Sequence, residues 1–128
     1  MLKKKIKYTD YNGAEREEDF YFNLSKAELS EMELSTTGGL RQMLEKIIAE
    51  QDTVKLAEFF KKIILKSYGE KSADGKHFYK RNGELANDFA ETEAYVELYM
   101  ELATDAEAAT KFVNGILPSE IRKELDKM

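Results

Sequence analysis

The sequence contains no cysteine, no tryptophan, one proline and one histidine in 128 residues. Without cysteine the chain can form neither a disulfide nor a thiolate metal site, and it has no cysteine nucleophile. The longest apolar runs are three residues, such as 63–65, whereas a membrane-spanning helix needs about 18 to 20. The basic start, MLKKKIKYTDY, also lacks the apolar stretch of a secretory signal. We therefore expect neither a membrane protein nor a secreted one.

The residues that are present favour one folded domain over residues 1–128. Hydrophobic residues make up 42% of the chain, with seven Phe and seven Tyr, and charged residues make up 35%. That balance supplies one core and a well-solvated exterior. The net charge of -5 argues against nucleic acid as the main partner, because phosphate binding requires clustered Lys and Arg.

Residues 1–24 are predicted to form a β-hairpin. Leu2, Ile6 and Tyr8 share one parity, Phe20 and Phe22 alternate with polar neighbours, and Asn12-Gly13 is a tight-turn dipeptide between the two runs. The alternative is an amphipathic first helix, but the turn formers and aromatic residues around position 12 are poor helix interior.

Residues 25–68 are predicted to be helical. Ser25 and Glu28 make a capping box, with Leu24 placed to staple against Leu29, and a helix should run from there to about Leu34. Gly38-Gly39 breaks that helix, and apolar residues then recur at helical spacing over 40–48. A third helix should begin near Asp52 and end at Tyr68-Gly69.

Residues 69–83 are rich in turn formers and lysine and are predicted to be an irregular loop. The acidic segment 84–128 returns to helical spacing, with Thr92 as a cap and Thr104 with Glu107 as a second capping box. Gly115 should stop that helix, and Pro118 should begin a last one. The predicted fold class is α+β, predominantly α-helical, with an N-terminal β-hairpin followed by about six short-to-medium helices.

Motifs for catalysis are weak. His77 lies in the basic loop with Asp74 three residues away, which suits a solvated histidine better than a general base or a metal ligand. Neither GxxxxGK[ST] nor GxGxxG occurs, so no phosphate-binding loop is indicated. We expect no enzyme activity, no cofactor and no metal, although an enzyme whose carboxylates meet only in the folded cleft stays an alternative.

Charge is distributed unevenly along the chain. Between residues 82 and 110 there are eight acidic residues and no Lys or Arg. Acidic residues at four-residue spacing, as in Glu93, Glu97 and Glu101, repel one another on a helix. The pattern fits either a face that steers a basic partner or an ordinary solvated face.

Aromatic residues and methionine follow the same segment, where they fit a binding groove or, given their helical spacing, the core. The candidate partner-binding residues are Phe89, Glu93, Tyr95, Glu97, Tyr99, Met100 and Glu101. A basic cluster around Phe78 and Tyr79 has two interpretations, contact with RNA or pairing with the acidic helices of another copy. Its members are Lys66, Lys71, Lys76, Lys80 and Arg81.

Three segments resemble a known family: FYFNLSKAELSEMELSTTGGL, ILKSYGEKSADGKHF and ETEAYVELYMELATDAEAATKFVNGILP. Together, over about residues 15–118, they are similar to small tail assembly chaperones encoded by long-tailed phages and prophages of Gram-positive bacteria.

The resemblance implies a non-catalytic protein of the host bacterial cytoplasm. Such a protein binds the tape measure protein, keeps it soluble, helps to recruit tail tube subunits and is absent from the mature virion. Self-association through the hairpin edge is a further expectation. The alternative is a small acidic protein-protein interaction or regulatory module of another function.

Overall fold

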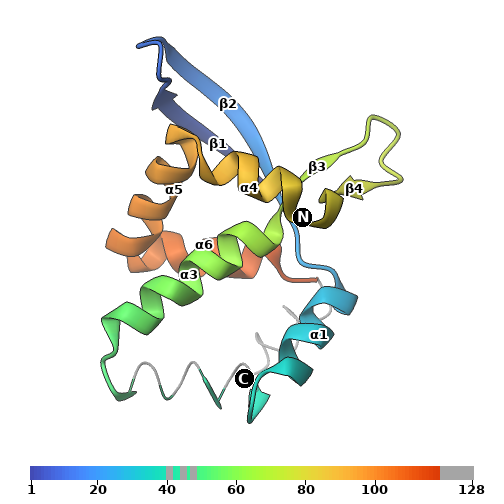
Figure 1. Cartoon of the computed structure of the whole chain (residues 1–128), viewed down its shortest axis with the longest axis vertical. Helices are drawn as coiled ribbons and strands as arrows, with labels where there is room; N and C mark the ends of the chain where they lie inside the picture. Colours follow the sequence, from blue (N-terminus) through green and yellow to red (C-terminus); the bar gives the residue numbers. More distant parts are fainter. Residues whose placement is uncertain (40–41, 44–45, 47–48, 119–128) are drawn as a thin grey trace.

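The computed structural model describes residues 1–39, 42, 43, 46 and 49–118, and Figure 1 shows its elements in order. A helical body of four helices lies beside a β-hairpin whose tip stands clear of it, and a further helix lies below the base of the sheet (Figure 1). The elements are β1 (Leu2–Thr9), β2 (Glu15–Phe22), α1 (Lys26–Ser35), α3 (Thr53–Ser67), β3 (Tyr68–Lys71), β4 (Phe78–Tyr79), the 3-10 turn η1 (Arg81–Gly83), α4 (Glu84–Ala90), α5 (Glu93–Thr104) and α6 (Ala106–Ile116).

The predicted hairpin is confirmed. β1 pairs antiparallel with β2 along its whole length, from Leu2 opposite Phe22 to Thr9 opposite Glu15. The Asp10 carboxylate accepts from the backbone N–H groups of Asn12 and Ala14, and Gly13 has a φ of 83°. Glycine adopts that left-handed conformation without steric cost, so the turn closes where the sequence places it.

The loop predicted over 69–83 is wrong in part, because this stretch contains two short strands. β3 pairs with Tyr21 and Phe22 of β2, and β4 pairs with β3, which gives a four-stranded antiparallel sheet in the order β1-β2-β3-β4. Gly69 lies where a Cβ would be 2.3 Å from the Phe78 ring. The bare backbone therefore permits the close approach of β3 and β4.

The predicted helix caps are mostly confirmed. Ser25 and Glu28 form the capping box, Asp52 accepts from the N–H of Lys55, and Thr92 accepts from the N–H of Tyr95. The box predicted at Thr104 is wrong, since the side chain of Asp105 caps α6 by accepting from two backbone N–H groups.

Gly115 does not stop α6, which continues to Ile116. A Cβ at Gly115 would lie 2.9 Å from Leu2 Cδ1, so this glycine lets the helix pack closely against β1. Glycine in the interior of a helix costs about 1 kcal/mol relative to alanine. Close packing of the helix against the strand, rather than helix termination, accounts for its position.

The described residues form five α-helices, where about six were predicted. The helix predicted over 40–48 falls mainly on residues outside the described set, and the one predicted to begin at Pro118 continues into 119–128, which also lie outside it. The fold class is otherwise as predicted, a helix-rich α+β chain with an N-terminal hairpin.

An aromatic cluster forms the centre of the core. Phe89 of α4 stacks on Tyr68 with ring centroids 4.3 Å apart, and its ring also meets Phe20 and Phe22 at 5.3 and 5.8 Å. Phe22 in turn contacts Phe112 of α6 at 5.2 Å. The cluster thus connects β2, β3, α4 and α6, and the tilted, edge-on and stacked ring contacts stabilise the core beyond the burial of apolar area.

Lys80 joins four segments below the sheet. Its ammonium group donates to the Glu28 carboxylate at 2.5 Å, to the Asn23 carbonyl at 2.8 Å and to the Lys66 carbonyl at 2.7 Å. Burial lowers the pKa of Lys80, and Glu28 opposes that shift. Partial burial acts to raise the pKa of Glu28, but hydrogen bonds from Lys80 and from Ser25 lower it overall. This Lys80 hub fixes the start of α1 against the end of α3.

Candidate partner-binding surface

Helix α5 presents one face to the core and another to solvent. Ala94, Leu98 and Leu102 are buried, and α5 packs along β1. On the other side Val96 is 42% exposed and Met100 is 51% exposed. Two apolar side chains at i and i+4 therefore point outward together, one turn apart.

Phe89 is not available to a partner. It is 2% exposed at the centre of the aromatic cluster. Tyr95 and Tyr99 are partly buried, and the Tyr95 ring meets Phe89 at 5.9 Å, edge to face. Burial raises the pKa of the Tyr95 hydroxyl, as does the neighbouring Tyr99. Of the aromatic residues and methionine proposed from the sequence, only Met100 is exposed.

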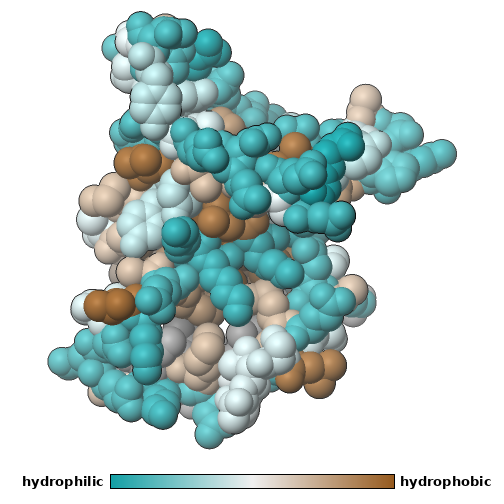
Figure 2. Space-filling model, viewed as in Figure 1, coloured by the Kyte–Doolittle hydropathy of each residue, from teal (hydrophilic) through white to brown (hydrophobic). Residues whose placement is uncertain are grey.

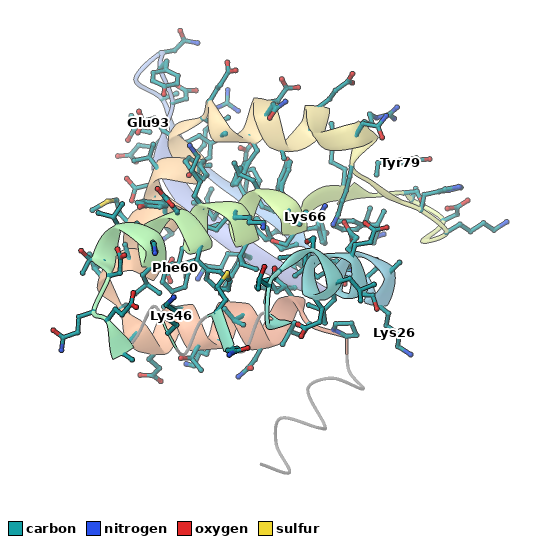
Figure 3. All side chains as sticks on the ribbon, turned by 60° about the horizontal axis from the view of Figure 1, so that its bottom comes forward. Lys26, Lys46, Phe60, Lys66, Tyr79 and Glu93 are labelled. Carbon is teal, nitrogen blue, oxygen red and sulfur yellow. The ribbon has the colours of Figure 1, made fainter. Side chains whose placement is uncertain are left out.

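The acidic residues of α5 also differ in their surroundings. Glu101 accepts from the Lys4 ammonium of β1 at 2.8 Å, so a base distant in sequence neutralises it. Glu93 lies at the start of α5, next to the hairpin tip (Figure 3), where desolvation and the charge and hydrogen bond of Glu93 raise the pKa of Tyr11. Glu97 is exposed and has no ion-pair partner among the described residues.

These observations define a surface that we call the α5 outer stripe: Glu93, Val96, Glu97 and Met100. Its positions follow the i, i+3, i+4, i+7 spacing of one helix face. Val96 was not among the candidate residues taken from the sequence, so its exposure was missed. Its neighbours Glu93, Glu97 and Met100 carried the missing signal, since they share its face and are polar or flexible.

The α5 outer stripe can make contacts but has no apparatus for covalent chemistry. Two exposed apolar side chains offer a narrow contact for a helix, and the flanking carboxylates favour basic residues in that partner. Figure 2 shows that apolar residues on the face it displays form separate spots among hydrophilic ones. Contacts on such a surface are small and reversible.

The basic cluster predicted around Phe78 and Tyr79 is only partly on the surface. Lys80 is directed inward to its three acceptors. The Arg81 guanidinium lies 4.9 Å from the centre of the Tyr79 ring. The His77 ring stacks on the same Tyr79 ring, with the two ring centroids 5.3 Å apart. Asp74 accepts from Ser72 and from the N–H of Lys76, so it shapes the turn and does not orient His77.

A groove that was not foreseen from the sequence lies between α3 and the segment that follows α1. This groove measures about 650 Å³. Phe59 and Met43 supply apolar lining, and charged residues of both signs surround them. The charged lining residues are Lys46, Glu50, Lys55, Glu58 and Lys62.

In the part of the chain that the structure describes, no three His, Asp or Glu side chains come together as a set of metal ligands. No helix there is both long enough and apolar enough to cross a membrane.

One comparison with known proteins identifies a relationship for the whole chain. A family model described as phage tail assembly chaperone matches residues 1–128. No curated protein and no solved structure matches the chain significantly.

Proposed function

The chain belongs to the phage tail assembly chaperone family, and we propose that it binds the tape measure protein of a long-tailed phage and keeps it soluble before assembly. It then helps to recruit tail tube subunits and leaves, so that the mature virion does not contain it. The work is done in the cytoplasm of the host bacterium. No covalent step is needed, because reversible burial of apolar client surface is sufficient.

The α5 outer stripe is the observation that supports a client-binding role. Val96 and Met100 are exposed on one helix face, between carboxylates of which Glu97 has no ion-pair partner in the described part of the chain. Because these two side chains lie one turn apart on the same helix face, one client residue can contact both of them. A client helix would place an apolar residue against Val96 and Met100 and a basic residue against Glu97.

Co-expression with the tape measure protein tests this proposal. We expect the chain to raise the soluble yield of the tape measure protein, and Val96→Asp to reduce its affinity for that protein at least tenfold, because the new charge would be desolvated in the interface. Val54→Asp is the matched control, since Val54 is 67% exposed on α3, on a different helix. If the wild-type chain leaves the soluble yield of the tape measure protein unchanged, the proposed chaperone role is wrong.

The two substitutions also locate the contact. If Val54→Asp weakens binding and Val96→Asp does not, the client uses the α3 side, next to the 650 Å³ groove, and the assignment to the α5 outer stripe is wrong.

The contribution of charge is tested separately with Glu97→Lys. Screening shortens the range of exposed charges to about 10 Å at 0.1 M salt. The loss of affinity should therefore be larger at about 50 mM than at about 500 mM salt. Glu101 is unsuitable for this purpose, because its reversal would also break the ion pair with Lys4.

A further inference from the structure

The outer edge of β1 is unpaired. β1 is the first strand of the sheet order, so no described strand bonds to its far side. The N–H of Asp10 donates to the Ala14 carbonyl at 2.9 Å, so even-numbered residues of this strand direct their backbone groups to β2. The N–H and C=O groups of Lys3, Lys5 and Lys7 therefore point outward, and no described residue bonds to them. These groups can receive one further strand.

The helices cover a face of β1 and leave this edge open. Even-numbered side chains face the helical body, because Ile6 is buried and the Lys4 ammonium reaches Glu101 of α5. Odd-numbered side chains lie on the opposite face, where the three lysines are exposed. Helix α5 thus lies against the even-numbered face, and the plane of the sheet beyond β1 is free of described strands.

The three lysines determine which strand fits. In an antiparallel pair, residues directly opposite one another share a face, so every second side chain of an added strand would lie beside a lysine. Within the chain these lysines meet acids loosely, with N–O distances of 3.5 Å for Lys3–Asp19, 3.8 Å for Lys5–Glu17 and 3.9 Å for Lys7–Glu17. Each ammonium group has three donors. Acidic residues at alternate positions therefore match this face.

Carboxylates of α5 limit the residues at the intervening positions, which would face the helices. Glu101 pairs with Lys4, and Glu97 borders a hollow that Tyr8 of β1 also lines. Glu93 lies next to the hairpin tip (Figure 3). The three carboxylates are four residues apart and follow one flank of α5 along β1. They would repel acids at the intervening positions, so a strand that is acidic on both faces does not fit.

A hollow of about 440 Å³ adds an apolar contact at the start of β1. Its apolar lining comes from Leu2, Ala108 and Phe112. In an added strand, the residue opposite Leu2 would share the face of Leu2 and point to this hollow. An apolar side chain therefore suits that position.

A second copy of β1 is a poor occupant of this edge. Joining β1 to β1 would set lysines opposite lysines, and like charges directly opposite one another destabilise a sheet. Lysines in an edge strand commonly prevent edge-to-edge pairing in this way. The same charges leave an acidic strand as the compatible occupant.

We propose that the outer edge of β1 binds an extended acidic segment of a protein partner by antiparallel strand addition. The segment carries Asp or Glu opposite Lys3, Lys5 and Lys7, basic or uncharged residues between them, and an apolar residue opposite Leu2. Backbone hydrogen bonds supply affinity and the alternating side chains supply specificity. This site differs from the α5 outer stripe, although Glu97 borders both, and it is tested without the tape measure protein.

The first experiment titrates the isotope-labelled full chain with an end-capped peptide that has this pattern, TKEVETEV, and follows amide exchange by NMR. Peptide concentrations up to roughly 1 mM are suitable, because one short strand buries little area. We expect the amides of Lys3, Lys5 and Lys7 to exchange at least threefold more slowly, and those of Lys4 and Ile6, already bonded to β2, to change less. No binding at that concentration, or binding without protection of the three amides, overturns the proposal.

A second peptide, TKVTEEEV, has the same composition with its acids grouped together. It should bind at least threefold more weakly, because one of its acids would face the carboxylates of α5 instead of a lysine. Equal affinity for the two peptides would mean that only net charge is recognised, and it would overturn the proposal.

An exchange of charges tests the register. Lys5→Glu should weaken binding of TKEVETEV at least threefold, and the peptide TKEVKTEV, whose central acid is replaced by lysine, should restore it. Lys61→Glu makes the same charge change on the exposed side of α3 and should have no effect. A peptide that fails to restore binding, or an equal effect of Lys61→Glu, overturns the register.

N-methylation of the peptide separates strand addition from charge attraction and leaves the protein unaltered. In the proposed register the N–H of the central Glu donates to the Lys5 carbonyl, whereas the N–H of the Val before it points away from β1. Methylating the Glu nitrogen should therefore abolish binding, and methylating that Val nitrogen should change it much less. Equal effects of the two methyl groups would overturn the proposal.

Discussion

Replacing Lys80 with methionine tests whether the Lys80 hub holds α1 on the body of the protein. Methionine keeps the apolar stem and removes the charge that donates to Glu28, Asn23 and Lys66. Glu28 would then stay partly buried, with its side chain 22% exposed and only the capping contacts of Ser25 remaining.

The size of the effect follows from the burial and the number of bonds. Removing one partner of a fully buried ion pair costs about 3–5 kcal/mol, and exposed pairs are worth less than about 1 kcal/mol. With both side chains 22% exposed, the expected loss of unfolding free energy is about 2–3 kcal/mol. For a chain of this length that corresponds to a fall in Tm of about 8–12 °C.

Urea unfolding of four proteins measures this effect: wild type, Lys80→Met, Glu28→Gln and the double variant. A coupling free energy of about 1 kcal/mol or more between the two sites is expected. Lys66→Met is the matched control, because it removes an exposed lysine nearby whose carbonyl, not its side chain, takes part in the hub. If Lys80→Met destabilises the protein no more than Lys66→Met does, the Lys80 hub does not hold α1 on the body of the protein.

Three further predictions follow from the core and its edges. Because the pKa of Glu28 is lowered, the stability that its ionised form contributes is present above the ordinary pKa of 4.5 and is lost as the pH falls through the lowered pKa. The difference in unfolding free energy between the wild type and Glu28→Gln should therefore shrink in acid. A difference that is constant from pH 7 to 3 would contradict this. Phe89→Ala should lower the free energy of unfolding by about 3–5 kcal/mol, whereas Met100→Ala should lower it by less than about 0.5 kcal/mol. Equal urea midpoints for the two variants would show that the two side chains lie in similar environments. Gly115→Val should destabilise the chain by about 1–3 kcal/mol, because the new side chain would press on Leu2. Adding Leu2→Ala to the Gly115→Val variant should recover part of the lost stability in a thermal melt. If no stability is recovered, the destabilisation is not steric.

Local signals explain the parts of the fold that could be predicted. The hairpin and the caps at Ser25, Asp52 and Thr92 each depend on residues within a few positions of one another. Asp105 was missed because Thr104 and Asp105 are both good caps, and the choice between them depends on where α6 meets α5.

The short strands were missed for a different reason. β3 and β4 are four and two residues long, with no alternation that a pattern can detect. They exist because β2 offers an edge to Gly69 and because Phe78 covers that glycine. Gly115 likewise resembles a helix stop until the packing of α6 on Leu2 is known.

The candidate surface was predictable as a segment but not as a set of residues. The acidic stretch 82–110 contains no Lys or Arg, but Lys4 reaches Glu101 from 97 residues away. Helix α5 carries apolar residues on most of its circumference, so spacing alone did not decide whether Val96 or Leu98 faces the core. Burial decided it, since Leu98 is enclosed and Val96 is not.

The bond between the Leu24 N–H and the Ile116 carbonyl, 2.9 Å long, has a consequence for synthesis. The hairpin leaves the ribosome well before α5 and α6, the helices that cover it. Until residue 116 has emerged, Phe22 and Leu24 lack the neighbours that bury them. The nascent chain therefore exposes the future centre of its core while residues 25–116 are being made, and burial of that centre waits for the arrival of α6.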